Sequence, residues 1–237
     1  MKNEKILSTI NLLAFAFLMY ASYLFTTNQT SFNKDLEPVF NPAPYTFSIW
    51  IIIYIALLIW IIKGFFAKHK IKDMYIKIYL YFALCMILNA IAVLVPTTLS
   101  MIIIIAELAS SIIIYDIVDN FNIATRYRVP FSLLSGWLSV ATIVNISKFL
   151  RNRGFTGIWG INEIGWTNIL LVLGVVLAIL FSIIKNDILY PLTFVWGYIG
   201  ILVQNKDVNS ILYTSIAMDI LIVIAIIYTK IRRRNYI

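Results

Sequence analysis

Eight mainly apolar stretches, most of them close to 20 residues long, constrain the fold of this chain more than any other feature. They cover residues 6–25, 47–66, 78–95, 99–117, 129–146, 166–184, 188–203 and 211–228. A helix needs about 20 such residues to cross a hydrocarbon core of about 30 Å, because each residue rises about 1.5 Å. The stretches are continuous and lack the alternation of barrel strands. They predict an all-α, polytopic integral membrane helix bundle with about eight transmembrane helices.

The composition excludes several other classes of protein. Apolar residues make up 61% of the chain and charged residues only 13%, whereas soluble domains have about 45–50% and about 25%. The single cysteine, Cys85, excludes an intrachain disulfide, and the single histidine, His69, excludes a site built on several histidines. We therefore expect no metal site, no required cofactor and no conventional catalytic residues.

The basic residues indicate how the helices are oriented. With eight spans, one face carries Lys2, Lys5, Lys63, Lys68, Lys70, Lys72, Lys77, Arg126, Arg128, Lys185, Lys230, Arg232, Arg233 and Arg234, with His69 in a basic loop. The other face carries Lys34, Lys148, Arg151, Arg153 and Lys206. The positive-inside rule predicts that both termini lie on the cytoplasmic side of the membrane. The protein is expected to be a multi-pass protein of the cell (inner) membrane. A seven-span alternative would put the C-terminal arginines outside, and Lys148, Arg151 and Arg153 depart from the rule.

The net charge of +8 is therefore explained by orientation. The basic clusters are expected to contact anionic membrane lipid, and no nucleic-acid partner is expected.

Two segments carry aromatic and amide side chains at helical spacing. In the stretch PAPYTFSIWIIIY, Phe47, Trp50 and Tyr54 are three and then four residues apart, which places them on one face of a helix. In VPFSLLSGWLSVATIVNIS, Trp137, Ala141 and Asn145 are successive positions four apart. Such faces suit a flat ligand. Ordinary packing or membrane-interface anchoring is the alternative.

These two segments resemble the signature stretches of the tryptophan-rich sensory protein family, to which the translocator protein belongs. The resemblance covers roughly residues 6–148 and includes Asn89, which is similar to an asparagine of the family's third helix. It departs from the family at Ala92, where a tryptophan is common, and at Tyr45, which ends a lead that is Pro-Pro-Gly-Trp in the family. It implies a five-helix translocator-like core at 1–150, followed by a three-helix extension with a basic tail at 151–237.

The resemblance also implies a ligand and a site. Family members bind porphyrins, other tetrapyrroles or sterol-like molecules, so we expect this protein to bind a planar hydrophobic small molecule and to act as a sensor or translocator. Light-dependent porphyrin breakdown is a further activity that the resemblance implies. The expected ligand-binding residues are Tyr45, Phe47, Trp50, Tyr54, Asn89, Trp137, Ala141 and Asn145.

Two carboxylates inside apolar stretches support a different function. Glu107 and Asp219 would each cost about 2.5–3.5 kcal/mol at the bilayer centre on insertion scales, so they should face the bundle interior. They are candidate proton carriers of a proton-coupled secondary transporter, or else neutral acids bonded to a neighbouring helix. A structural membrane subunit is a third alternative, and a homodimer is compatible with all three.

Overall fold

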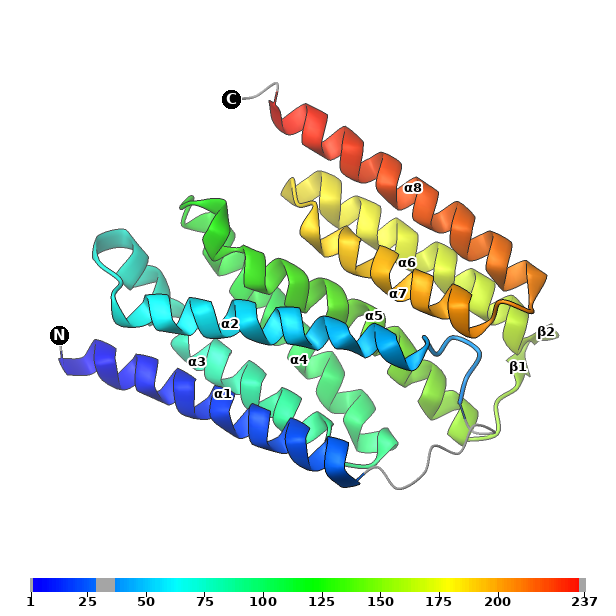
Figure 1. The fold of residues 1–237 in the computed structure, drawn as a ribbon, viewed down its shortest axis with the longest axis horizontal. Coiled ribbons are helices and arrows are strands. Elements are labelled where there is room, and N and C mark those ends of the chain that lie inside the picture. Colours follow the sequence, from blue (N-terminus) through cyan, green and yellow to red (C-terminus); the bar gives the residue numbers. More distant parts are fainter. Residues whose placement is uncertain (1, 29–36, 235–237) are drawn as a thin grey trace. The chain divides into compact units, whose positions relative to one another are not determined.

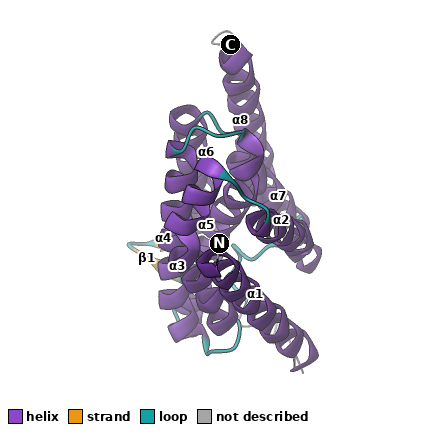
Figure 2. Cartoon of the chain, turned by 90° about the vertical axis from the view of Figure 1, so that its left-hand side faces the viewer, coloured by secondary structure: helices purple, strands orange, loops and turns teal. Residues whose placement is uncertain are grey.

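The computed structural model describes residues 2–28 and 37–234, and this part of the chain is almost entirely helical (Figure 2). The described residues form eight α-helices (Figure 1): α1 (Lys2–Asn28), α2 (Ile49–Phe65), α3 (His69–Ala92), α4 (Thr97–Asn120), α5 (Val129–Asn152), α6 (Glu163–Lys185), α7 (Leu189–Gln204) and α8 (Asn209–Arg234). Two 3₁₀ turns, η2 (Pro44–Ser48) and η3 (Thr125–Tyr127), precede α2 and α5. A short antiparallel hairpin, β1 (Gly157–Ile158) with β2 (Ile161–Asn162), precedes α6.

The lengths of these helices match those needed to cross a membrane. In the described part of the chain seven helices are long and apolar enough to span a bilayer, and α7, with 16 residues, is the shorter eighth. At about 1.5 Å per residue α7 is about 24 Å long, somewhat less than a typical hydrocarbon core. The predicted all-α, polytopic membrane fold is confirmed.

One predicted loop is wrong. His69 is the first residue of α3, so it does not lie in a basic loop, and Lys70, Lys72 and Lys77 follow it on the helix. Charge opposes burial in lipid, but lysine is a good helix former. The apolar stretch therefore marks where the helix enters the membrane and not where it begins.

The same effect lengthens α5. The helix continues to Asn152, so Lys148 and Arg151 are helical and Arg153 follows directly. Lys148 pairs with Glu37 at 3.2 Å, and Arg151 pairs with Glu163 at 3.1 Å. Acidic partners thus accompany two of the basic residues that departed from the positive-inside pattern. Lys34, on the same predicted face, lies outside the described residues.

The chain packs as two compact units. Unit 1 comprises residues 1–32 and 49–138, and unit 2 comprises residues 33–48 and 139–237. In unit 1, α1 packs on α2 and α3, and α3 packs on α4. Its aromatic centre is Trp60, which stacks on Phe82 at 5.1 Å and meets the edge of Phe131 at 5.1 Å.

Unit 2 is built on α6, α7 and α8, each of which contacts the other two. The second half of α5 belongs to it, and the Ser139 and Tyr190 hydroxyls hydrogen-bond at 2.7 Å. Residues 37–48 also pack in this unit, with η2 against α7. The boundary between the units crosses α5 between Leu138 and Ser139. The predicted division into a core at 1–150 and an extension at 151–237 does not refer to these packing units, and it stays a prediction.

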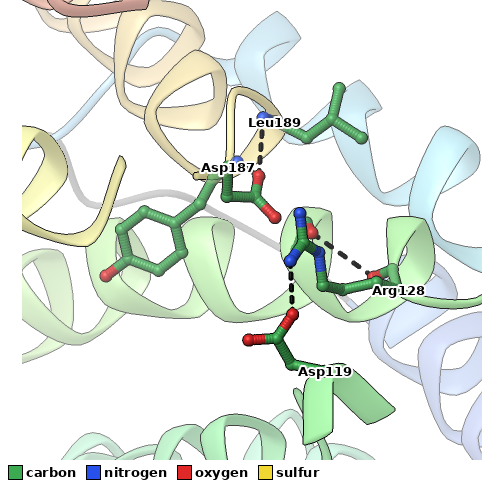
Figure 3. A network of polar contacts seen from close by, with 6 residues as sticks. Asp119, Arg128, Asp187 and Leu189 are labelled. Carbon is green, nitrogen blue, oxygen red and sulfur yellow. Dashed lines mark hydrogen bonds and ion pairs between the residues drawn. The ribbon is translucent and has the colours of Figure 1, made fainter. Parts of the chain in front are cut away.

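Polar contacts hold a helix connection within each unit (Figure 3). In unit 1, Arg128 pairs with Asp119, which ties the start of α5 to the end of α4. In unit 2, Asp187 Oδ1 accepts the main-chain N–H groups of Leu189 at 2.8 Å and Tyr190 at 3.1 Å. These two N–H groups would otherwise lack partners at the start of α7.

Candidate ligand site

The predicted aromatic face of the second span is divided by a change in backbone geometry. Pro42 restricts the backbone before η2, Pro44 is the first residue of η2, and α2 begins only at Ile49. Phe47 therefore lies on a 3₁₀ turn and is 40% exposed, while Trp50 and Tyr54 lie on α2 and are half-buried. The regular helical face begins at Trp50.

Trp50 and Tyr54 form a stacked pair on α2. Their ring centroids are 5.2 Å apart at an interplanar angle of 29°. Helix α1 supports Tyr54 from two positions seven residues apart, which share one face of the helix. The Phe15 ring meets Tyr54 edge to face at 6.1 Å, and the Ser22 and Tyr54 hydroxyls are 3.2 Å apart. The pair is therefore held in a defined orientation.

A buried acid lies in the same unit. Glu107 on α4 is 1% exposed, and its Oε1 accepts a hydrogen bond from Asn89 Nδ2 on α3 at 2.7 Å. The structure thus brings together Asn89, expected to bind ligand, and Glu107, expected to carry protons. Tyr54, also expected to bind ligand, lies in the same unit.

The three predicted residues of the fifth span all lie on the continuous helix α5. Trp137 and Ala141 are buried and Asn145 is half-buried. Asn145 Nδ2 donates to the Ala141 carbonyl at 2.9 Å, so this amide has a partner on its own helix. Trp137 belongs to unit 1, and Ala141 and Asn145 belong to unit 2.

The second predicted acid lies on α8 in unit 2. Asp219 is half-buried, and its Oδ1 has no hydrogen-bond partner among the described residues. Asp219 therefore lacks the amide partner that Glu107 has in unit 1.

Sequence reasoning missed three residues that contact the predicted ones. Phe15 and Ser22 support Tyr54 from α1. Trp196 on α7 meets the ring of Tyr45 edge to face at 5.8 Å in unit 2. The tryptophan in the seventh apolar stretch was the available signal, because a tryptophan in a membrane helix offers both a flat ring and an N–H donor.

An open groove on α6 and α8 was also not predicted. It has a volume of about 570 Å³, and its lining residues are Asn168, Ile169, Val172, Leu173, Tyr213, Thr214, Ala217 and Met218. None of the predicted site residues is among them. Its apolar walls are those expected of a helix surface in contact with lipid.

A family model described as "TSPO-like protein" matches residues 5–228. The chain belongs to the TSPO-like protein family. The match begins in α1 and ends in α8, so it extends beyond the residues whose motifs suggested the resemblance. Searches of curated proteins and of solved structures gave no match. Membership in the TSPO-like family, together with the apolar helices, identifies a multi-pass membrane protein. It suggests a membrane protein of the sensor or translocator type.

Proposed function

We propose that this TSPO-like protein binds a planar hydrophobic molecule, a porphyrin, another tetrapyrrole or a sterol-like compound, and senses it or passes it on. The observation that carries the proposal is the stacked, half-buried pair of Trp50 and Tyr54 on α2. A flat ligand can extend such a stack, and each aromatic pair contributes about 0.5–1.5 kcal/mol beyond the burial of its area.

The aromatic pair carries a polar group, the Tyr54 hydroxyl, and unit 1 also holds a buried polar pair. The Tyr54 hydroxyl has its partner on Ser22, and the Asn89–Glu107 pair lies in the same unit. Small-molecule sites are mostly apolar with a few oriented polar groups. This combination suits a ligand with a flat apolar body and few polar substituents.

The test is titration of the protein in nanodiscs with protoporphyrin IX, followed by quenching of tryptophan fluorescence. Trp50→Leu should weaken binding by about two- to tenfold, the loss of one aromatic pair. Trp50→Phe keeps a ring and should have a smaller effect. Trp159→Leu is the control, because Trp159 is 87% exposed and lies in the hairpin connection of unit 2. Unchanged affinity in a Trp50→Leu/Tyr54→Leu protein would contradict the site.

Proton-coupled transport is a second candidate, and the burial of Glu107 favours it. An acid that is 1% exposed inside a membrane bundle is costly and is typical of proton relays. Asp219, with an oxygen that has no partner among the described residues, is the second candidate carrier. The two acids lie in different units.

This candidate is tested in proteoliposomes loaded with a pH-sensitive dye. Added protoporphyrin IX should drive a change in internal pH that Glu107→Gln or Asp219→Asn abolishes. Asp73→Asn is the control, because Asp73 is exposed on α3. A pH change that persists in both Glu107→Gln and Asp219→Asn proteins would rule out these carriers.

A further inference from the structure

Residues 37–48, called here the lead segment, run directly into α2 and pack within unit 2. Glu163, the first residue of α6, and Asn205, the residue after α7, bind the main chain of the segment at Val39. The Val39 N–H donates to Glu163 Oε1 at 2.9 Å, and its carbonyl accepts from Asn205 Nδ2 at 3.0 Å. Both main-chain polar groups of Val39 are therefore bound by side chains at the start of α6 and just after the end of α7.

A second set of contacts lies on α7 near the end of the lead segment. The Ala43 N–H donates to the Gly200 carbonyl at 3.0 Å. Trp196 Nε1 donates to the Thr46 carbonyl at 2.7 Å, and the Trp196 ring meets Tyr45 edge to face. One helix thus binds the main chain and an aromatic side chain of the segment together.

Gly200 allows this close approach. A Cβ atom at this position would collide with the side chain of Thr46, which is fully buried, and would lie 3.0 Å from Pro42 Cβ. A side chain at residue 200 would therefore push the lead segment away from α7. Glycine has a steric function here.

The polar contacts also answer a physical requirement of the segment. Non-helical backbone next to a membrane needs partners for its N–H and C=O groups. Pro38, Pro42 and Pro44 have no N–H to satisfy. The N–H groups of Val39 and Ala43 are bound by Glu163 and Gly200. The sequence of the segment and the surface of α6 and α7 are therefore complementary.

We propose that α7 positions Tyr45, one of the expected ligand-binding residues, by binding the lead segment within unit 2, and that Trp196 and Gly200 are positioning residues that set where Tyr45 and Thr46 lie. Tyr45 remains 44% exposed while its ring contacts Trp196, so it can contact a planar aromatic ligand. The role in ligand binding rests on the proposed function, whereas the docking of the segment is testable without a ligand.

The first experiment measures docking in the full chain in nanodiscs. Ala43→Cys places a thiol at a position that is 5% exposed, and the native Cys85 is fully buried. The rate of maleimide labelling then reports how often the segment leaves α7. Gly200→Ala should raise this rate about tenfold, as expected when buried hydrogen bonds are lost. Trp196→Leu should act in the same direction.

A rescue and a matched control separate positioning from general damage. Thr46→Ala removes the two nearest atoms that a Cβ at residue 200 would meet and leaves Pro42 Cβ at 3.0 Å, so Gly200→Ala/Thr46→Ala should return the labelling rate towards that of the parent. Gly174→Ala in α6 creates a similar collision with Tyr198 within the same unit and should leave labelling unchanged. Equal increases in the Gly200→Ala and Gly174→Ala proteins, or no increase in either, would overturn the proposal.

The second experiment measures protoporphyrin IX affinity in the same proteins. Gly200→Ala should weaken binding severalfold, because it moves Tyr45 without replacing any of the expected ligand-binding residues. The Thr46→Ala rescue should restore binding. Faster labelling with unchanged affinity would overturn the contribution of Tyr45, as positioned by α7, to ligand binding. A parent protein that binds no protoporphyrin would instead contradict the proposed function, while the labelling results would still decide whether α7 docks the segment.

Discussion

Asn89 gives Glu107 a hydrogen bond inside unit 1, and both side chains are almost fully buried. A buried carboxyl without a partner is costly, and a donated hydrogen bond reduces that cost. Glu107 could be predicted to face the bundle interior, because an acid in an apolar stretch has few alternatives. The pairing of Glu107 with Asn89 could not be predicted from the sequence, because this pairing depends on how α3 and α4 are aligned.

The Asn89–Glu107 bond leads to a stability prediction. Asn89→Ala should lower the free energy of unfolding by about 1–3 kcal/mol, because it leaves a buried acceptor without its donor. SDS titration in mixed micelles would measure the change. Asn120→Ala is the control, because Asn120 is exposed at the end of α4. Asn89→Leu/Glu107→Leu should be less destabilised than Asn89→Ala, since both partners are then apolar. Equal losses would contradict this account.

The hydroxyl of Tyr75 allows a second test, of how much one buried hydrogen bond contributes to the free energy of unfolding. Its hydroxyl donates to the Trp60 carbonyl at 2.7 Å, whereas Tyr81 on the same helix is exposed. Tyr75→Phe should cost about 0.5–1.5 kcal/mol of unfolding free energy, and Tyr81→Phe should cost almost nothing. The same SDS titration compares the two. Similar values for both tyrosines would show that the buried bond has no net effect.

At the scale of the helix, the apolar stretches predicted the number and type of the elements. They did not predict the ends, since α3 begins nine residues before its apolar stretch and α5 continues six residues after its own. Hydropathy reports which residues can enter lipid, while helix formation depends on local hydrogen bonding and propensity. The 3₁₀ turn at Phe47 was missed for a similar reason, because residue spacing alone does not distinguish it from an α-helix.

The start of α6 provides a test of helix capping. The Asn162 side chain accepts the Gly165 N–H at 2.9 Å and caps the helix. Asn162→Ala should destabilise the helix by about 0.5–2 kcal/mol, while Asn162→Asp should retain the cap. Hydrogen exchange of the first turn of α6 would detect the difference as faster exchange. An alanine protein with unchanged exchange would show that the hairpin alone holds this end.

At the scale of the whole molecule, the positions of the charges lead to a topology prediction. With eight spans, Lys206 and Lys68 should lie on opposite faces of the membrane. A membrane-impermeant maleimide should label Lys206→Cys in intact cells and Lys68→Cys only after permeabilisation. Labelling of Lys230→Cys from outside would instead indicate an odd number of crossings. Lys68, Lys206 and Lys230 are exposed and Cys85 is fully buried, so background labelling should be low.

The bond between Thr46 and Trp196 joins residues 150 positions apart in the chain. A ribosome adding about 5–20 residues per second needs roughly 8–30 s to make that interval. During this time the lead segment has left the ribosome, while the helix that binds it does not yet exist. Early helices must therefore enter the bilayer with this segment still unbound. A factor that protects nascent membrane proteins would have to protect the lead segment throughout this time. The segment can bind α7 only when synthesis is nearly complete.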